Sequence, residues 1–256
     1  MHQLIDTHAH LDEIDDTEAV LAEAAAVGVT GIVAVGEDHA SNIRVLELAA
    51  KYPGVVFPAL GLHPWNIKPN KIDETLKFVE EHAENAVAIG EIGLDYHKRV
   101  RQVADKDIQK EVFFSLLEIA VLHGKPASIH SRYAWKDAVN LVVSSGLKQP
   151  VFHWFTGPSS VLSEIIQRGY YLSATPAVAY HEEHRRAIRD CPINQLLLET
   201  DTPVTYGFGR GFEFTASPKD IMKVLSSLTE ILSLSAETIA EATSANAKTL
   251  FNIQNK

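Results

Sequence analysis

The sequence of 256 residues contains one cysteine, Cys191, two methionines and no apolar run long enough to cross a bilayer. One cysteine cannot form an internal disulfide, and without a second one it cannot build a thiolate metal site. The first residues lack the basic segment and apolar core of a secretion signal. We therefore expect a cytoplasmic protein without a membrane segment, in which Cys191 is a small buried side chain.

Basic residues are also scarce, with 23 Lys and Arg against 33 Asp and Glu, for a formal net charge of -10. A protein that coats nucleic acid through a broad basic face has the opposite balance. The acidity does not exclude an enzyme that acts on nucleic acid. Two bound divalent cations would add about four positive charges at the place where phosphate binds.

The chain also lacks a Gly-x-Gly-x-x-Gly turn after its first apolar segment, which disfavours an open dinucleotide-binding sheet. Short β-rich segments instead alternate with segments of helical period. Strands are predicted at 4–7, 31–35, 56–60, 87–91, 126–129, 150–152, 170–173 and 196–199. Eight strands in a chain near the typical ~250 residues predict an α/β protein, a TIM-like (β/α)8 barrel in a single domain over residues 1–256.

Helices are predicted between these strands at 17–27, 39–51, 71–84, 103–123, 134–145, 158–168, 180–189 and 218–232. Glycines at 28, 146 and 169 follow predicted helices, as helix ends favour. The last segment, 235–251, reads as one or two extra C-terminal helices that cover part of the barrel wall.

Polar side chains of metal-binding type follow five of the eight predicted strands. In such barrels the catalytic groups lie at the carboxyl ends of the strands. Packing alone would favour Val, Ile or Leu at these positions, so the recurrence points to a shared site. The residues are His8 and His10 after the first strand, Glu91 on the fourth, His130 after the fifth, His153 after the sixth and Asp201 after the eighth.

Four histidines and two carboxylates exceed the three protein ligands of a usual mononuclear catalytic zinc site. Two divalent ions (Mg, Mn or Zn) are therefore expected, with Glu91 as the bridge. One division places His8, His10 and Asp201 near one ion and His130 and His153 near the other. The nitrogen and oxygen ligands leave the identity of the metal open.

Two metal ions predict hydrolysis by an activated water, because bound water loses its proton near neutral pH. Asp201 is in position to accept that proton, and no Ser or Cys nucleophile is evident. The expected enzyme is therefore a metal-dependent hydrolase.

The motifs together resemble the TatD-like metal-dependent DNases of the amidohydrolase superfamily. They occur in order between residues 4 and 203: Asp-Thr-His-Ala-His (6–10), Gly-Leu-His-Pro (61–64), Gly-Glu-Ile-Gly-Leu-Asp (90–95), Ile-His-Ser-Arg (129–132), His-Trp-Phe-Thr-Gly (153–157) and Glu-Thr-Asp-Thr-Pro (199–203).

The resemblance implies a two-metal centre and hydrolysis of phosphodiester bonds in DNA, often from the 3′ end. The family's ligands carry over onto the six residues that the strand ends select. It further implies that His63 approaches the scissile phosphate, as a catalytic and substrate-binding residue. Arg132 is a candidate phosphate clamp, since a guanidinium binds phosphate through two hydrogen bonds; a surface ion pair is the alternative.

The chain departs from the family pattern after Asp201, where members have a loop leading to Arg-Gly-x-x-Asn-x-Pro. Arg210, Gly211 and Pro218 keep part of that string, but the Asn is missing. Arg210 is retained as a candidate substrate-binding residue. Tyr133 likewise stands where an acidic residue is expected.

Aromatic and basic residues near the strand ends are candidates for contacts to nucleic acid. Aromatic side chains can stack on a splayed base, although core or rim packing is the alternative for each. Three basic residues after the fourth strand form a possible short phosphate track, or a solvated loop. The aromatic set is Trp65, Trp154, Phe155, Tyr206 and Phe208, and the basic set is Lys98, Arg99 and Arg101.

The expected substrate is therefore DNA with short, single-stranded or frayed ends, degraded 3′ to 5′ by a monomer. A hydrolase of small cyclic amides, lactones or esters is the alternative, because fold and metals do not fix the electrophile. A binding protein that has lost activity is the third hypothesis, which six intact ligands disfavour.

Overall fold

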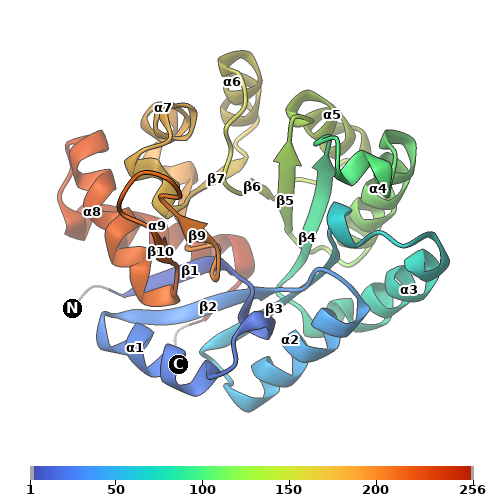
Figure 1. Cartoon of the computed structure of the whole chain (residues 1–256), viewed down its shortest axis with the longest axis horizontal. Coiled ribbons are helices and arrows are strands. Elements are labelled where there is room, and N and C mark those ends of the chain that lie inside the picture. The colour runs from blue at the N-terminus through green and yellow to red at the C-terminus, as the bar shows by residue number, and fades with distance from the viewer. Residues whose placement is uncertain (1–2, 255–256) are drawn as a thin grey trace.

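The chain folds into a barrel of eight parallel strands surrounded by helices, as predicted (Figure 1). The computed structural model describes residues 3–254. Each strand pairs with its neighbours in chain order, β1 to β8. The strands are β1 Leu4–Ala9, β2 Val29–Val35, β3 Val56–Leu62, β4 Ala88–Asp95, β5 Ala127–Arg132, β6 Pro150–Phe152, β7 Tyr171–Ala174 and β8 Leu196–Leu198.

A seam of hydrogen bonds closes the barrel between β8 and β1 at the carboxyl ends of these strands. Asp201 N–H donates to the carbonyl of His8 at 3.0 Å, and His10 N–H donates to the carbonyl of Thr202 at 2.8 Å. The buried Asp6 carboxylate accepts from Thr200 N–H at 3.0 Å. The seam therefore places Asp201 beside His8 and His10, which precede it by 193 and 191 residues in the sequence.

The helices lie outside the strands and bury one apolar face each against them (Figure 1). They are α1 Thr17–Ala26, α2 His39–Lys51, α3 Ile72–His82, α4 Lys106–Leu122, α5 Trp135–Ser145, α6 Ser159–Gln167, α7 Glu182–Asp190, α8 Ile221–Leu232 and α9 Ala236–Phe251. One helix follows each of the eight strands, and α9 is extra. No helix in the described part of the chain combines the length and apolarity that spanning a membrane requires.

Strands β1, β4 and β5 run further than predicted, and one loop contains an unpredicted hairpin. Strands β1 and β5 extend to Ala9 and Arg132, so His8 and His130 lie within the strands and not after them. Strand β4 continues four residues past Glu91, because its backbone pairs with β5 as far as Asp95 opposite Arg132. Glu91 therefore lies within the strand and not at its lip. The loop after β8 also contains an unpredicted hairpin, β9 (Thr205–Tyr206) and β10 (Phe214–Thr215).

Helix α9 packs against the inside of the barrel and not only against its wall. Its Ala247, Leu250 and Phe251 join a buried cluster with Ile5 and Leu197. These two strand residues alternate with neighbours that face the outer helices, so they point inward. Helix α9 therefore closes the end of the barrel opposite the strand ends that carry the polar residues.

This packing predicts that Leu250→Ala lowers the free energy of unfolding by about 2–5 kcal/mol, because it leaves a cavity in the closed end. Urea unfolding followed by circular dichroism measures the change. The matched control is Glu241→Ala on the exposed face of α9, with an expected change within about 0.5 kcal/mol. Equal effects of the two variants would contradict the packing role of α9.

Candidate metal centre

A cavity of about 830 Å³ opens at the carboxyl ends of the strands. Because β1, β4, β5, β6 and β8 all deliver their polar residues to this end, the side chains meet here from distant parts of the chain. Five of the six predicted ligands line the cavity, and His8 is fully buried beside them. The five are His10, Glu91, His130, His153 and Asp201.

Glu91 lies at the centre of the group, and its two carboxylate oxygens face different histidine pairs. Oε2 lies 3.4 Å from His8 Nε2 and 3.6 Å from His10 Nε2. Oε1 lies 3.0 Å from His130 Nδ1 and 2.7 Å from His153 Nε2. The carboxylate thus divides the histidines into the two sets that the sequence predicts.

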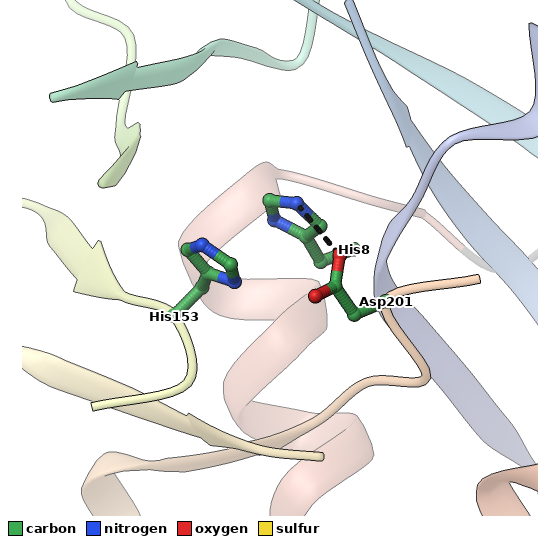
Figure 2. A group of neighbouring side chains, drawn as sticks. All are labelled: His8, His153 and Asp201. Atoms are coloured by element: carbon green, nitrogen blue, oxygen red, sulfur yellow. Dashed lines mark ion pairs between the residues drawn. The ribbon is translucent and has the colours of Figure 1, made fainter. Parts of the chain in front are cut away.

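Asp201 faces the pair from β1. Its Oδ1 lies 3.3 Å from His10 Nε2 and 3.7 Å from His8 Nε2. Figure 2 shows Asp201 and the rings of His8 and His153 gathered around one space, with the rings stacked at a centroid distance of 4.2 Å. Asp201 adopts a left-handed backbone with φ of 51°, which is uncommon for a residue with a side chain and aims the carboxylate inward.

The charges in the cluster depend on one another. Burial opposes ionisation of the Glu91 carboxyl, but the histidine rings around it hold its pKa well below the usual range. Burial likewise opposes protonation of His153, and Glu91 and Glu199 raise its pKa well above the ordinary value. The buried carboxylates therefore need positive charge beside them, from protonated imidazoles or from a metal ion.

The donor atoms fit a metal better than a hydrogen-bond network. In the described residues, His8 Nε2 and Glu91 Oε1 are buried without a hydrogen-bond partner, although imidazole nitrogens lie within 3.0 Å of Oε1. A tetrahedral ion with bonds of 2.0–2.1 Å separates its ligand atoms by about 3.4 Å. The spacings around Glu91, from 2.7 Å to 3.6 Å, bracket this value.

Two buried carboxylates behind the histidines were missed by the sequence prediction. Glu199 Oε1 lies 3.6 Å from His153 Nδ1, and Asp95 Oδ2 lies 3.4 Å from His130 Nε2. Metal-binding histidines commonly donate their second ring N–H to a carboxylate, which fixes the ring. Asp95 and Glu199 both belong to motifs that contain a predicted ligand, Glu91 and Asp201 respectively. Their place in these motifs was the sequence signal that could have identified them.

Glu199 is itself held in place by two donors. Trp154 N–H donates to Oε1 at 3.0 Å, and the Ser173 hydroxyl donates to Oε2 at 2.7 Å. His8 has a comparable partner, because its Nδ1 lies 3.0 Å from Ser128 Oγ. Because Glu199 and Ser128 face the Nδ1 atoms of His153 and His8, the Nε2 atoms of both rings face Glu91.

His63 enters the cluster from the loop after β3. Its Nε2 lies 3.5 Å from Glu91 Oε1, close enough to count with His130 among possible ligands. Burial lowers the pKa of His63 to about 3, so the ring is neutral. Its Nδ1 accepts a hydrogen bond from Trp65 N–H at 3.2 Å, which places the ring proton on Nε2. In this tautomer the Nε2–H of His63 is a hydrogen-bond donor directed at Glu91.

The two candidate arginines lie in different surroundings. Arg132 lines the cavity, pairs with Asp95 at 2.8 Å and stacks over the Trp65 ring at 5.1 Å. It therefore combines the ion pair and the cavity position that the sequence left as alternatives. Arg210 lies on the hairpin after β8, with its guanidinium over the Tyr180 ring at 4.9 Å, and does not line the cavity.

The five aromatic candidates lie in three different surroundings: the cavity wall, the core and the exposed surface. Trp65 and Trp154 line the cavity. The stacking interpretation is wrong for Phe155 and Tyr206, which are fully buried in the core. Phe208 lies outside the cavity with 82% exposure. Two aromatic side chains that we did not predict, Tyr133 and Trp135, also line the cavity.

The basic residues after β4 do not join the cavity wall. Lys98, Arg101 and Lys106 line a separate depression together with Asp105 and Asp107, whose carboxylates offset part of the positive charge. This arrangement matches the solvated loop that was the alternative to a phosphate track.

Comparison with known proteins agrees with this geometry. Residues 5–252 match the family described as TatD related DNase. The chain is 35% identical to the uncharacterized metal-dependent hydrolase YabD of Bacillus subtilis, over 98% of this chain and 99% of that one. It is 29% identical to deoxyribonuclease TATDN3 of Homo sapiens, over 97% and 94% of the two chains.

A solved structure gives the same result for the fold. The chain superposes on YJJV, a TatD homologue from Escherichia coli, with a TM-score of 0.86 at 30% identity, over 98% of each chain. The predicted barrel, the predicted hydrolase class and the predicted resemblance are confirmed together. This chain belongs to the TatD-related DNase family of metal-dependent hydrolases.

Proposed function

We propose that the chain is a deoxyribonuclease that uses two divalent ions, Mg, Mn or Zn, to hydrolyse phosphodiester bonds. The observation that carries the proposal is the division of the Glu91 carboxylate between two histidine pairs, 3.4–3.6 Å from one oxygen and 2.7–3.0 Å from the other. A carboxylate placed in this way is suited to bridge two ions. The human relative's name, deoxyribonuclease, supports DNA as the substrate.

Six residues would hold the ions. His8, His10 and Asp201 would bind one ion, His130 and His153 the other, and Glu91 both. When bound, the ions would supply a water acidic enough to attack at neutral pH and would stabilise negative charge on the phosphate. Asp201 places one carboxylate oxygen against His8 and His10, which leaves the other to accept the proton of the attacking water.

The remaining polar residues in the cavity bind the substrate. His63 donates a hydrogen bond from Nε2 to a phosphate oxygen, since its Nδ1 accepts from Trp65 N–H. Arg132 contacts phosphate while Asp95 holds its guanidinium in one orientation. Both residues favour a phosphate over the neutral carbonyl of a lactone or cyclic amide, so the small-molecule hydrolase remains the second candidate.

The substrate is single-stranded or frayed DNA, degraded from the 3′ end. Exposed aromatic rings at the cavity, Trp65 above all, suit unpaired bases. The acidic net charge of -10 disfavours a long duplex footprint. We further propose that the protein acts in the cytoplasm as a monomer.

The test of this function is incubation of the purified protein and Mg or Mn with a labelled single-stranded oligonucleotide, and in parallel with lactones and cyclic amides. Stepwise 3′ shortening supports the proposal. Turnover of the small molecules without cleavage of DNA selects the second candidate.

Glu91→Gln and Asp201→Asn should each reduce nuclease activity by about 10²–10⁴-fold, because one removes the bridge and the other the proton acceptor. Initial rates on the oligonucleotide measure the loss, and thermal unfolding verifies the fold. Glu84→Gln, an exposed carboxylate away from the cavity, is the control. Wild-type rates in either site variant would refute the assignment.

Glu199→Gln should weaken metal binding by about 10–100-fold, because the amide no longer fixes the His153 ring as a carboxylate does. Competition with a chelator measures the affinity. The control is Asp190→Asn, an exposed carboxylate at the end of α7. Unchanged affinity in the Glu199 variant would show that the contact to His153 has no role in binding.

His63→Gln should lower kcat by about 10²-fold or more while the bound metal stays at the wild-type level, because His63 donates and does not ligate. His130→Gln serves as the contrast and should lose metal. Elemental analysis of both purified variants separates the roles. Comparable metal loss from the two would make His63 a ligand.

A further inference from the structure

The hairpin after β8 presents an unusual group of side chains at its turn. We call residues 207–213 the hairpin tip; their sequence is Gly-Phe-Gly-Arg-Gly-Phe-Glu. Phe208 is 82% exposed and Phe212 is 49% exposed. Single exposed apolar residues are common on proteins, but here two aromatic rings and an arginine stand together. The group therefore suggests a binding surface.

The hairpin tip has a defined shape. Arg210 N–H donates to the carbonyl of Gly207 at 2.9 Å, and Gly209 N–H donates to the Glu213 carboxylate at 2.6 Å. Gly207 adopts a φ of 72°, and a Cβ on it would lie 2.7 Å from the Phe212 ring. Glycine is therefore required there to hold the turn. A shaped tip presents its side chains with little loss of entropy on binding.

The tip is also joined to the wall of the cavity. Gly207 N–H donates to the Tyr180 hydroxyl at 3.2 Å, and the Phe212 ring contacts the Tyr180 ring at 5.6 Å. His181, the next residue after Tyr180, lines the cavity, as does Val204 at the base of the hairpin.

The distance from the cavity can be bounded from the chain. Phe208 lies four positions after Val204, so the chain between them spans at most about 14 Å. Bases spaced at about 3.4 Å cover this distance in about four nucleotides. A strand of about five nucleotides with its end in the cavity is therefore long enough to reach Phe208.

The chemistry of the tip fits single-stranded nucleic acid. Phe208 offers a ring face to a base, and stacking of this kind is sequence-tolerant. The Arg210 guanidinium lies over the Tyr180 ring at 4.9 Å, and the same ring contacts Phe212. The Glu213 carboxylate, the one acidic group in the tip, is engaged by Gly209 N–H. A cation beside stacked rings matches the alternation of base and phosphate in one strand.

We propose that the hairpin tip is a second DNA subsite outside the cavity, in which Phe208 stacks on an unpaired base and Arg210 binds a backbone phosphate. The inference rests on the proposed deoxyribonuclease function and gives that enzyme a preference for longer strands. The metal centre and the tip then bind the same strand at two points.

The first test is Phe208→Ala, assayed on oligothymidylates of 3 and 12 nucleotides. KM for the 12-mer should rise about tenfold, as loss of one stacked base predicts, with the rise confined to substrates long enough to reach the tip. The control is Leu122→Ala at the end of α4, which removes another highly exposed apolar side chain, at 70% exposure. An equal KM in the Phe208 and Leu122 variants overturns the proposal.

The second test is the salt dependence of binding. Arg210→Gln should reduce the slope of log Kd against log salt for the 12-mer by about 0.7, the value for one phosphate contact on a single strand. An unchanged slope overturns the role of Arg210. Anisotropy of a labelled 12-mer measures this binding without turnover, so the subsite is tested even if no DNA is cleaved and the proposed function fails.

Sedimentation of the wild type and Phe208→Ala gives the last comparison. Equal mass for the two proteins supports a DNA subsite. A wild-type dimer that Phe208→Ala converts to a monomer would assign the tip to self-association and overturn the proposal.

Discussion

The structure depends on a buried negative charge, the carboxylate of Glu91, which is 2% exposed and surrounded by imidazoles. An ionised carboxylate in such a place is costly unless positive charge lies beside it. The chain meets this requirement with histidines from four strands or strand ends. Their side chains converge only because the parallel strands of a barrel all finish at the same rim. A buried carboxylate, which would be unfavourable in an apolar core, is therefore the centre of the candidate metal site.

Polar groups around this centre hold the candidate ligands in position. Glu199 and Asp95 lie behind two of the histidines, and Ser128 lies behind a third. The seam between β8 and β1 fixes Asp201 opposite the histidines of β1 through backbone hydrogen bonds. At the other end of the barrel, α9 closes the apolar interior. One end is therefore packed for stability, which leaves the other free to carry polar groups.

The chain is acidic overall, yet its proposed substrate is an anion. The cations and donors that favour phosphate are local: His63 and Arg132 in the cavity and Arg210 on the hairpin tip. Asp95 contacts both a candidate substrate-binding residue and a candidate metal ligand, because it pairs with Arg132 and lies behind His130. Substrate orientation and ligand orientation are thereby linked through a single buried carboxylate.

The sequence alone determined the barrel, the family and the side chains that meet at the centre. These follow from local signals: the alternation of apolar strand and helix, and the type of residue at each strand end.

The tertiary structure decided the features that depend on contacts between distant residues and on loop conformation. Strand β4 runs past Glu91 because β5 supplies partners for its backbone. Phe155 and Tyr206 turn inward, whereas Phe208 stays exposed, because loop conformations set which rings find core contacts. The ring proton of His63 is set by Trp65 N–H through the folding of one short loop. Contacts between residues far apart in the chain, and the shape of loops, emerge only when the barrel closes.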